Sequence, residues 1–167
     1  ERGFPERFGH QLGDLVVVLD VSVQAVAAKQ EAIAGDDIDV GGVAGTVKSV
    51  SIVATTVTTP DNQVIVIPNK NVWGNTITNV TTSDTRRVDL TFGIGYDDSI
   101  ESALQVLEEV VTRHPLVLKD PTPMIRVSEL ADSSVNFIVR PWTKTADYWT
   151  VYWDLQHAVK DAFDANG

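Results

Sequence analysis

The three histidines, His10, His114 and His157, are the side chains of this chain best suited to acid–base or metal chemistry. A zinc site needs ligands at short, fixed intervals, such as two histidines four residues apart on one helix. These histidines lie far apart in the sequence, and none has such a partner. We therefore interpret each as an ordinary polar residue and predict no metal site.

Acidic residues and glycines gather between residues 36 and 45. Asp36, Asp37 and Asp39 precede the segment GGVAGTV, which supplies neither further oxygen ligands nor the final acidic residue of a calcium loop. Its glycines are not followed by a Lys-Ser or Lys-Thr pair at the spacing of a phosphate-binding loop. The sequence also contains no GxSxG motif, and no Ser-His-Asp arrangement stands out. We therefore predict no cofactor and no enzymatic activity.

The composition is that of a globular protein with a strong acidic charge. The 167 residues carry a formal net charge of −10, and 43% of them are hydrophobic. Binding to nucleic-acid phosphates depends on clustered Lys and Arg, and no basic stripe is present, so the sequence predicts no nucleic-acid partner. The chain has no cysteine, which excludes disulfides and thiolate chemistry.

No segment has the pattern of a membrane-spanning helix. The most apolar stretch, residues 12–34, is interrupted by Asp14, Asp20, Lys29 and Glu31. A charge near the middle of a bilayer costs about 2.5–3.5 kcal/mol on insertion scales, so four such residues outweigh the valines around them. We expect the chain as written to be soluble. Residues 1–34 mix strand and helix periodicity, and we leave open whether they form a helix, a strand or both.

Residues 35–83 are predicted to form a small, curved antiparallel β domain of the Sm-like type. Four or five short β-branched runs are separated by Gly, Asn, Asp and Pro. The sequence TPDN at residues 59–62 predicts a tight turn, and the run 64–67 ends at Pro68 because proline cannot extend a ladder. The glycines of GGVAGTV permit a sharp bend or a close approach of two backbones.

Residues 84–167 follow a different pattern, which predicts a ferredoxin-like α/β domain. Strand, helix, strand, strand, helix is most of such a layer, so the predicted fold class of the whole chain is α+β. The last strand of the layer is missing, and we expect it to follow Gly167 in a longer protein. The predicted elements are strands over residues 86–96, 124–127 and 134–142, a helix that follows the N-cap signal at 97–99 and ends before Pro115, and a helix over 147–164.

Aromatic residues concentrate in the last predicted helix and just before it. At helical spacing, most of them are interpreted as core packing. Tyr and Trp are also enriched where subunits meet, because they bury a large area and keep a polar group. We therefore name Tyr148 and Trp149 as candidate interface residues, ahead of Trp153. The aromatic residues of this region are Trp142, Tyr148, Trp149, Tyr152, Trp153 and Phe163.

Several motifs, taken in order, resemble the mechanosensitive channel of small conductance (MscS) family. The resemblance covers residues 35–167, and it rests on the order and spacing of motifs that are weak one by one. It implies a β domain followed by an α/β domain, in subunits that assemble seven to a ring around a hollow cytoplasmic chamber with side openings. The motifs are GGVAGTV, VIVIPN, GNTITN, RRVDLTFGIGYD, SSVNFIVRPW and VYWDL.

The resemblance implies roles for three residues. Asn69 and Lys70 match a loop that lies near the end of the pore helix in the family and takes part in gating or inactivation. Asp89 matches a position near the side openings, where charge biases which ions enter. The implied partners are identical subunits in a heptamer, together with permeating ions and small osmolytes. The implied activity belongs to a bacterial inner-membrane channel that opens under membrane tension, to which this chain would contribute assembly and ion filtering on the cytoplasmic side.

The N-terminal segment departs from the family pattern. The family's membrane helices, including a pore helix rich in Gly and Ala, are not in this sequence, so we expect contact with the membrane only through helices absent from the chain. Residues 31–34 also lack the Arg-Pro-Phe-like junction of the family. One alternative remains open: a soluble oligomeric binding module, Sm-like plus ferredoxin-like, for RNA or a small ligand. The acidic charge disfavours RNA binding.

Overall fold

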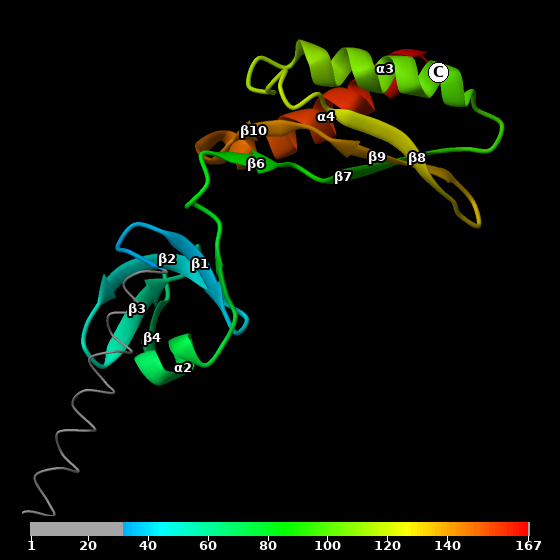
Figure 1. The fold of residues 1–167 in the computed structure, drawn as a ribbon. Helices are drawn as coiled ribbons and strands as arrows, with labels where there is room; N and C mark the ends of the chain where they lie inside the picture. Colours follow the sequence, from blue (N-terminus) through cyan, green and yellow to red (C-terminus); the bar gives the residue numbers. More distant parts are fainter. Residues whose placement is uncertain (1–31, 167) are drawn as a thin grey trace, which may run out of the picture. The chain divides into compact units, whose positions relative to one another are not determined.

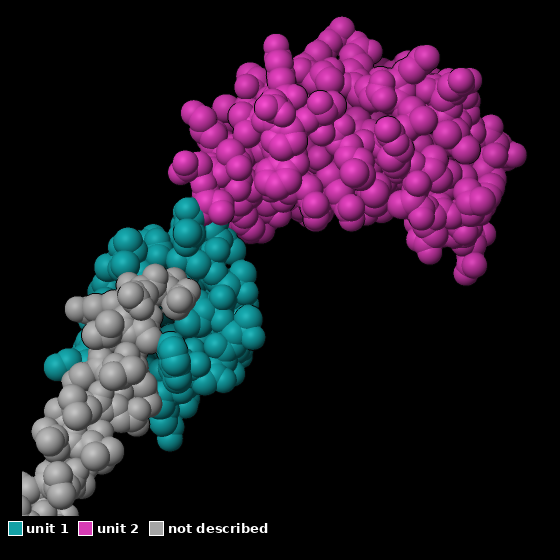
Figure 2. All heavy atoms as spheres, viewed as in Figure 1, with its two compact units in different colours: residues 1–82 teal, residues 83–167 magenta. Residues whose placement is uncertain are grey.

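The computed structural model describes residues 32–166, and the chain divides into two compact units, residues 1–82 (unit 1) and 83–167 (unit 2) (Figures 1 and 2). Each unit has its own hydrophobic core. The helix or strand expected within residues 1–34 falls almost wholly outside the described residues, and the assignment of that segment as a separate part of the chain stays a prediction.

Unit 1 is a five-stranded, curved sheet with a short helix (Figure 1). Its strand order is β4-β3-β2-β1-β5, and every pairing is antiparallel, which confirms the predicted antiparallel β domain. The buried face is made mainly of valine and isoleucine from the strands. The elements are β1 (Asp37–Val40), β2 (Val43–Val50), β3 (Ala54–Thr58), β4 (Val64–Pro68), α2 (Asn69–Trp73) and β5 (Ile77–Asn79).

The glycines of the turn between β1 and β2 and of β2 itself are needed for two different structural reasons. Gly41 and Gly42 form the two-residue turn with φ of 59° and 88°, a region that residues with a Cβ rarely adopt. A Cβ on Gly45 would lie 2.5 Å from the carbonyl oxygen of Thr58 and 2.8 Å from Cγ1 of Val57. Strands β2 and β3 can therefore approach at this point because residue 45 has no side chain.

The turn between β3 and β4 lies where it was predicted. The backbone N–H of Thr59 donates to the carbonyl of Gln63 at 2.9 Å, and Asn62 adopts φ of 66°. Asparagine occupies this left-handed region more readily than most residues. Strand β4 ends at Pro68, as expected, and α2 begins directly after it. The sequence pattern does not predict this five-residue helix.

Unit 2 is a three-stranded antiparallel sheet with two helices on one face and a two-stranded ribbon beside it (Figure 1). The sheet order is β7-β9-β8, and β6 pairs with β10 in the ribbon. The order of strands and helices is that of the predicted ferredoxin-like domain. The elements are β6 (Thr85–Arg87), β7 (Leu90–Ile94), α3 (Ile100–Arg113), β8 (Met124–Leu130), β9 (Val135–Arg140), β10 (Trp142–Lys144), the 3-10 turn η1 (Thr145–Asp147) and α4 (Tyr148–Asn166).

The predicted strand over residues 86–96 is wrong as a single element, because the chain changes sheets within it. Strand β6 pairs with β10, whereas β7 pairs with β9. Between them the backbone N–H of Val88 donates to the carbonyl of Pro141 at 2.9 Å. Pro141 interrupts the opposite strand at the same level, so the predicted strand 134–142 is also divided. Val88 is buried like Leu90, and the apolar alternation therefore continues across the break.

The core of unit 2 lies between the sheet and the two helices. Helix α3 begins after Ser99, whose Oγ accepts from the backbone N–H of Ser102 at 3.3 Å. Its predicted apolar face is confirmed, except that Ile100 is exposed. The helices and the middle strand meet through small and branched side chains. The buried members of these three elements are Ala103, Leu107 and Val111 from α3, Val135, Phe137 and Val139 from β9, and Val151, Leu155 and Val159 from α4.

The interpretation of the α4 aromatics as core residues is wrong for two of them. Trp149 is 55% exposed and Trp153 is 61% exposed. Helix α4 buries its valine and leucine side chains instead, and these fill the space above the sheet. Tyr148, Tyr152 and Phe163 are partly buried against the core. In residues 32–166, no helix is both long enough and apolar enough to cross a bilayer.

Candidate functional site

Asn69 is a buried side chain whose hydrogen bonds join three parts of unit 1. Its side chain is 2% exposed. The amide nitrogen donates to the carbonyls of Ser51 and Ile52 at 2.9 and 3.0 Å, and the amide oxygen accepts from Thr55 Oγ1 at 3.0 Å. The backbone N–H of Asn69 also donates to the carbonyl of Val53 at 2.9 Å. The residue therefore holds the loop between β2 and β3 against the start of α2.

Lys70, the neighbouring candidate, has the opposite character. Its side chain is exposed on α2. Two loop residues held by Asn69, Ile52 and Val53, are also exposed although they are apolar. Asn69 is thus a buried residue that holds the loop by hydrogen bonds, and Lys70 beside it is an exposed positive charge. The arrangement offers no nucleophile or general base.

Asp89 lies at the break between β6 and β7 and contacts two arginines. Nε and a terminal nitrogen of Arg87 donate to its two carboxylate oxygens at 2.7 and 3.0 Å. Nε of Arg140, at the end of β9, lies 3.3 Å from Oδ1. This nitrogen is buried and has no hydrogen-bond partner among the described residues, so its contact with Asp89 is an ion pair without hydrogen-bond geometry. We call Arg87, Asp89 and Arg140 the Asp89 cluster.

The cluster stabilises the ionised carboxylate of Asp89. The hydrogen bonds from Arg87 lower the pKa of Asp89, and the charges of Arg87 and Arg140 act in the same direction. The side chain remains about half exposed, at 52%. Asp89 is therefore a charged, accessible carboxylate, but one that two guanidinium groups accompany.

The exposed aromatics of α4 form a continuous strip with Tyr148 and Tyr152. The rings of Trp149 and Trp153 stack with centroids 5.3 Å apart, and Tyr148 meets Trp149 edge-on at 5.1 Å. The guanidinium carbon of Arg86, on β6, lies 3.9 Å from the centre of the Tyr148 ring. We call Tyr148, Trp149, Tyr152 and Trp153 the aromatic strip. It contains both predicted interface candidates.

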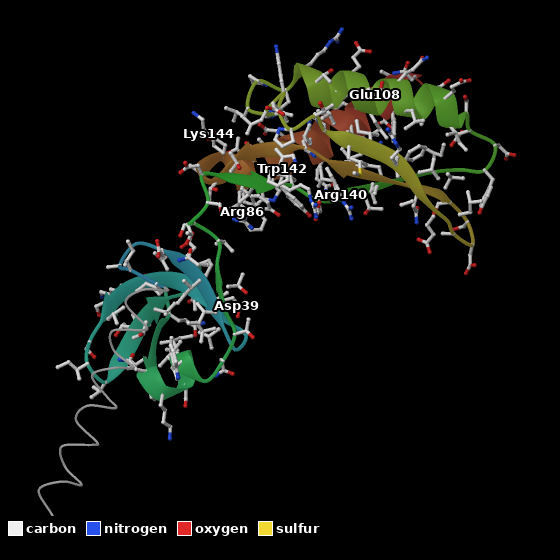
Figure 3. All side chains as sticks on the ribbon, viewed as in Figure 1. Asp39, Arg86, Glu108, Arg140, Trp142 and Lys144 are labelled. Carbon is white, nitrogen blue, oxygen red and sulfur yellow. The ribbon has the colours of Figure 1, made fainter. Side chains whose placement is uncertain are left out.

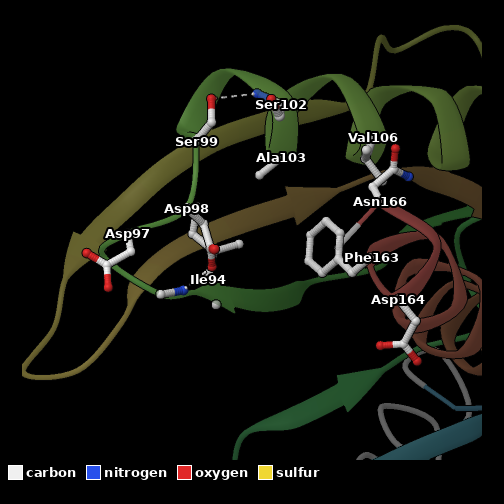
Figure 4. A pocket seen from close by; sticks show the side chains of 12 residues that line it. Ile94, Asp97, Asp98, Ser99, Ser102, Ala103, Val106, Phe163, Asp164 and Asn166 are labelled. Atoms are coloured by element: carbon white, nitrogen blue, oxygen red, sulfur yellow. Dashed lines mark hydrogen bonds between the residues drawn. The ribbon is translucent and has the colours of Figure 1, made fainter.

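A groove in unit 2 lies between β7, the start of α3 and the end of α4 (Figure 4). Two of its polar side chains, Asp98 and Ser99, bond to the backbone. Asp98 Oδ2 accepts from the N–H of Gly95 at 2.8 Å, and Ser99 caps α3. Phe163 lines the groove near the last turn of α4, and no histidine, lysine or arginine is among the lining residues. The groove holds no nucleophile–base pair.

The other residues considered for chemistry have structural partners. Asp36 accepts hydrogen bonds from the N–H of Ile33 at 3.0 Å and from Asn79 Nδ2 at 2.8 Å, and the Ile33 bond is the main cause of its lowered pKa. His114 Nε2 lies 3.3 Å from Asp154, and His157 Nδ1 lies 3.2 Å from Asp161. His10 lies outside the described residues. Residues 32–166 contain no group of three side chains that could hold a metal ion.

Reasoning from the sequence missed Arg87 and Arg140 as partners of Asp89. The strand alternation does place Asn136, Ile138 and Arg140 on the face of β9 opposite Phe137. That signal shows the direction of the arginine, but the partner across the sheet follows only from the strand register. The three predicted candidates, Asn69–Lys70, Asp89 and Tyr148–Trp149, lie in separate clusters.

Two family profiles match the chain, one in each half. Residues 22–82 match the profile described as the β-domain of the mechanosensitive ion channel, and residues 88–167 match the C-terminal profile of the mechanosensitive ion channel MscS. The chain is 44% identical over 133 residues to a small-conductance mechanosensitive channel of Edwardsiella ictaluri, covering 80% of the chain and 46% of that protein. It is 41% identical over 130 residues to an uncharacterised MscS family protein of Synechocystis, covering 78% of the chain and 44% of that protein.

The fold also matches solved structures. The crystal structure of Helicobacter pylori MscS in the closed state aligns with a TM-score of 0.82 at 25% identity, covering 94% of this chain and 65% of that one. A cryo-EM structure of Arabidopsis thaliana MSL1 aligns with a TM-score of 0.70 at 16% identity, covering 91% of this chain and 59% of that one, and it shows likeness of fold alone. The chain spans less than half the length of the two curated relatives described above.

Proposed function

This chain belongs to the MscS family of mechanosensitive ion channels, of which it carries the β domain and the C-terminal domain, and we propose that it forms part of the vestibule on the cytoplasmic side of a channel pore. The channel would lie in the bacterial inner membrane and open under membrane tension to release ions and small osmolytes. This chain would supply assembly and ion filtering. Members of the family are channels and not enzymes, in agreement with the predicted absence of catalysis.

One observation carries the proposal: the two domains follow one another in the family's order, one in each compact unit. A longer relative with the same pair of domains is a named small-conductance mechanosensitive channel. Conduction and tension sensing require a bilayer-spanning element, and no helix of residues 32–166 could be one. We therefore assign those activities to the whole channel and not to these two domains.

Apolar side chains on both units support assembly from identical subunits. In unit 1, the edge strand β4 exposes Val64 and Val66, and Trp73 is exposed on α2. In unit 2, the exposed part of the aromatic strip is Trp149 and Trp153. Contiguous exposed apolar patches, unlike single exposed residues, mark interaction sites. Repetition of one heterologous contact around an axis closes a ring, and the family resemblance puts the number of subunits at seven.

We assign two further roles within this proposal. Asn69 and Lys70, which the structure places in the first turn of α2 and not in a loop, would form the segment that responds to the pore helix, with Asn69 holding the exposed Ile52 and Val53 in position. Asp89 would lie by a side opening of the vestibule, where its charge and those of its arginine partners act on entering ions.

Native mass spectrometry of the purified chain, with mass photometry at several concentrations, tests the proposal. We expect a closed oligomer of a single stoichiometry, seven by resemblance to the family. A chain that stays monomeric at high concentration would remove assembly from the proposed function.

A further inference from the structure

Among residues 83–166, one face of the three-stranded sheet of unit 2 has no helix over it. Helices α3 and α4 pack on the face that carries Phe137 and its buried neighbours. Because side chains alternate along a strand, Ile138 and Arg140 lie on the other face. Figure 3 shows Arg140 on the side of the sheet away from α3. We call this surface the open face.

The strand register brings three arginines to one end of the open face. Leu90 pairs with Val139, so Asp89 comes opposite Arg140 on the neighbouring strand. On the other side, Arg126 of β8 pairs with Ile138, which places it diagonally from Arg140 at about 7–8 Å between backbone positions. Arg87 lies beside Asp89 through its bidentate contact.

The charges at this end of the open face do not cancel. Arg87, Arg126 and Arg140 stand against one carboxylate, Asp89, at this end of the face. The other acidic residue of this face, Glu129, is hydrogen-bonded to Asn136 at 3.1 Å and pairs with it further along the sheet. Arg126 is exposed and has no acidic partner within 4 Å among the described residues.

This local positive charge contrasts with the rest of the protein. The chain as a whole carries a net charge of −10. In unit 2 most acidic side chains belong to the helices and loops, such as Glu101 and Glu108 of α3 and Asp161 of α4. The open face therefore differs from the helical face in the sign of its charge.

We propose that the open face of unit 2 is a weak binding surface for small oxyanions, carboxylates and phosphate, with Arg140 and Arg126 as the residues that select them. Asp89 is the counter-charge of the cluster and neutralises one guanidinium. The inference rests on the proposed ion-filtering function. It adds that an entering ion meets a net positive charge beside Asp89.

The chemistry of the guanidinium group favours oxyanions over chloride. Its planar fork of N–H donors matches two oxygens of a carboxylate or phosphate, whereas chloride offers no pair of acceptors. The Arg140 side chain is 35% exposed, so part of its guanidinium group can be reached from solvent, although Nε itself is buried. Weak binding also suits a filter, because an ion that passes must be able to leave.

Nuclear magnetic resonance of the purified chain tests the proposal through the arginine Nε–Hε signals. Sodium phosphate and sodium acetate would each be titrated against sodium chloride at constant ionic strength. We expect the Arg140 and Arg126 signals to shift and saturate with both oxyanions and to respond weakly to chloride. Arg113 is the internal control, because it lies on α3 and pairs with Glu109 on the opposite face of unit 2. Equal shifts with phosphate, acetate and chloride, or equal shifts of the Arg113 and Arg140 signals, would overturn the proposal.

Three variants sharpen the result. Arg126→Gln, at an exposed position, should weaken phosphate binding about two- to fivefold, the range of one exposed ion pair. Asp89→Asn should strengthen it by a similar factor, because the repelling charge goes while an amide oxygen can still accept from Arg87. Arg113→Gln should change nothing. If Asp89→Asn leaves the affinity unchanged or lowers it, Asp89 is not the counter-charge and the proposal fails.

Measuring the oligomeric state and the arginine signals on the same sample distinguishes a failure of this inference from a failure of the proposed function. Oxyanion binding by a chain that stays monomeric would remove assembly and keep the binding surface. A closed oligomer whose arginine signals ignore phosphate would keep the vestibule and remove the surface.

Discussion

Asn69 supplies three side-chain hydrogen bonds from a position that water does not reach. Replacing it with alanine leaves the buried hydroxyl of Thr55 and the partly buried carbonyls of Ser51 and Ile52 without that partner. Each buried, unsatisfied polar group costs about 1–3 kcal/mol. We therefore predict that Asn69→Ala lowers the free energy of unfolding of unit 1 by about 2–4 kcal/mol. Urea unfolding followed through amide signals of unit 1 would measure it.

Lys70→Ala is the matched control for that change. Lys70 is exposed on the same short helix, and we expect an effect within about 0.5 kcal/mol. Equal losses for the two variants would mean that the hydrogen bonds of Asn69 contribute nothing specific. Electrical recordings of the whole channel with each variant would then test whether Asn69 and Lys70 act directly in gating.

Asp36 makes the stability of unit 1 depend on pH. The hydrogen bond from Ile33 lowers the pKa of Asp36 below its ordinary value of 3.8, and Asn79 and Thr81 act in the same direction. A lowered folded-state pKa stabilises the fold above the unfolded pKa, and this contribution is lost as the pH falls through the folded value. We predict that Asp36→Asn destabilises unit 1 at pH 7 and that the difference from the unaltered chain narrows below about pH 4.

Chemical unfolding at a series of pH values would measure that narrowing. Asp97→Asn, which changes an exposed carboxylate in the turn before α3, serves as the control. A difference between the Asp36 variant and the unaltered chain that is constant from pH 7 to pH 3 would contradict the linkage.

At the scale of elements, the close approach of β2 and β3 depends on the missing side chain of Gly45. A Cβ at this position would meet the carbonyl oxygen of Thr58 at 2.5 Å, closer than such atoms approach, and that oxygen belongs to backbone that cannot turn aside. We predict that Gly45→Ala destabilises unit 1 by about 1–3 kcal/mol, the usual cost of forcing extra volume into packed structure. Thermal unfolding would show it, and Ala44→Ser, at the exposed neighbouring residue, should have little effect. If the two variants melt alike, β2 and β3 can separate without cost.

The elements of both units show which structural features could be predicted from the sequence alone. Turn residues 59–62, the end of β4 at Pro68 and the apolar face of α3 were predictable because each depends on local chemistry or on a short period. The break between β6 and β7 was not, since Val88 and Leu90 keep the alternation while the chain moves from one sheet to another. Helix α2 is too short to show a period.

The candidate site was predictable to a smaller extent than the fold. Asp89 was named through the family resemblance, but Arg87 and Arg140 enter only through register and ion-pair geometry. The aromatic strip was misread in part because helical spacing alone does not tell which side of α4 faces the sheet. Valine and leucine at positions 151, 155 and 159 fill that side and leave Trp149 and Trp153 exposed.

At the scale of the whole molecule, assembly should depend on side chains that contribute little to the stability of one subunit. Trp149 is 55% exposed and stacks on Trp153, so Trp149→Ser removes exposed aromatic surface without opening the core. We predict that the unfolding midpoint of this variant stays within a few degrees of that of the unaltered chain. We also predict that the variant dissociates to monomers at protein concentrations where the unaltered chain is a closed oligomer, because large aromatics at interface centres carry much of the binding energy. Mass photometry across a dilution series would measure the shift. Leu130→Ser, at the exposed end of β8, tests whether any loss of apolar surface has the same effect. If the Leu130 variant dissociates as readily, or the Trp149 variant stays assembled, the aromatic strip is not the contact that joins the subunits.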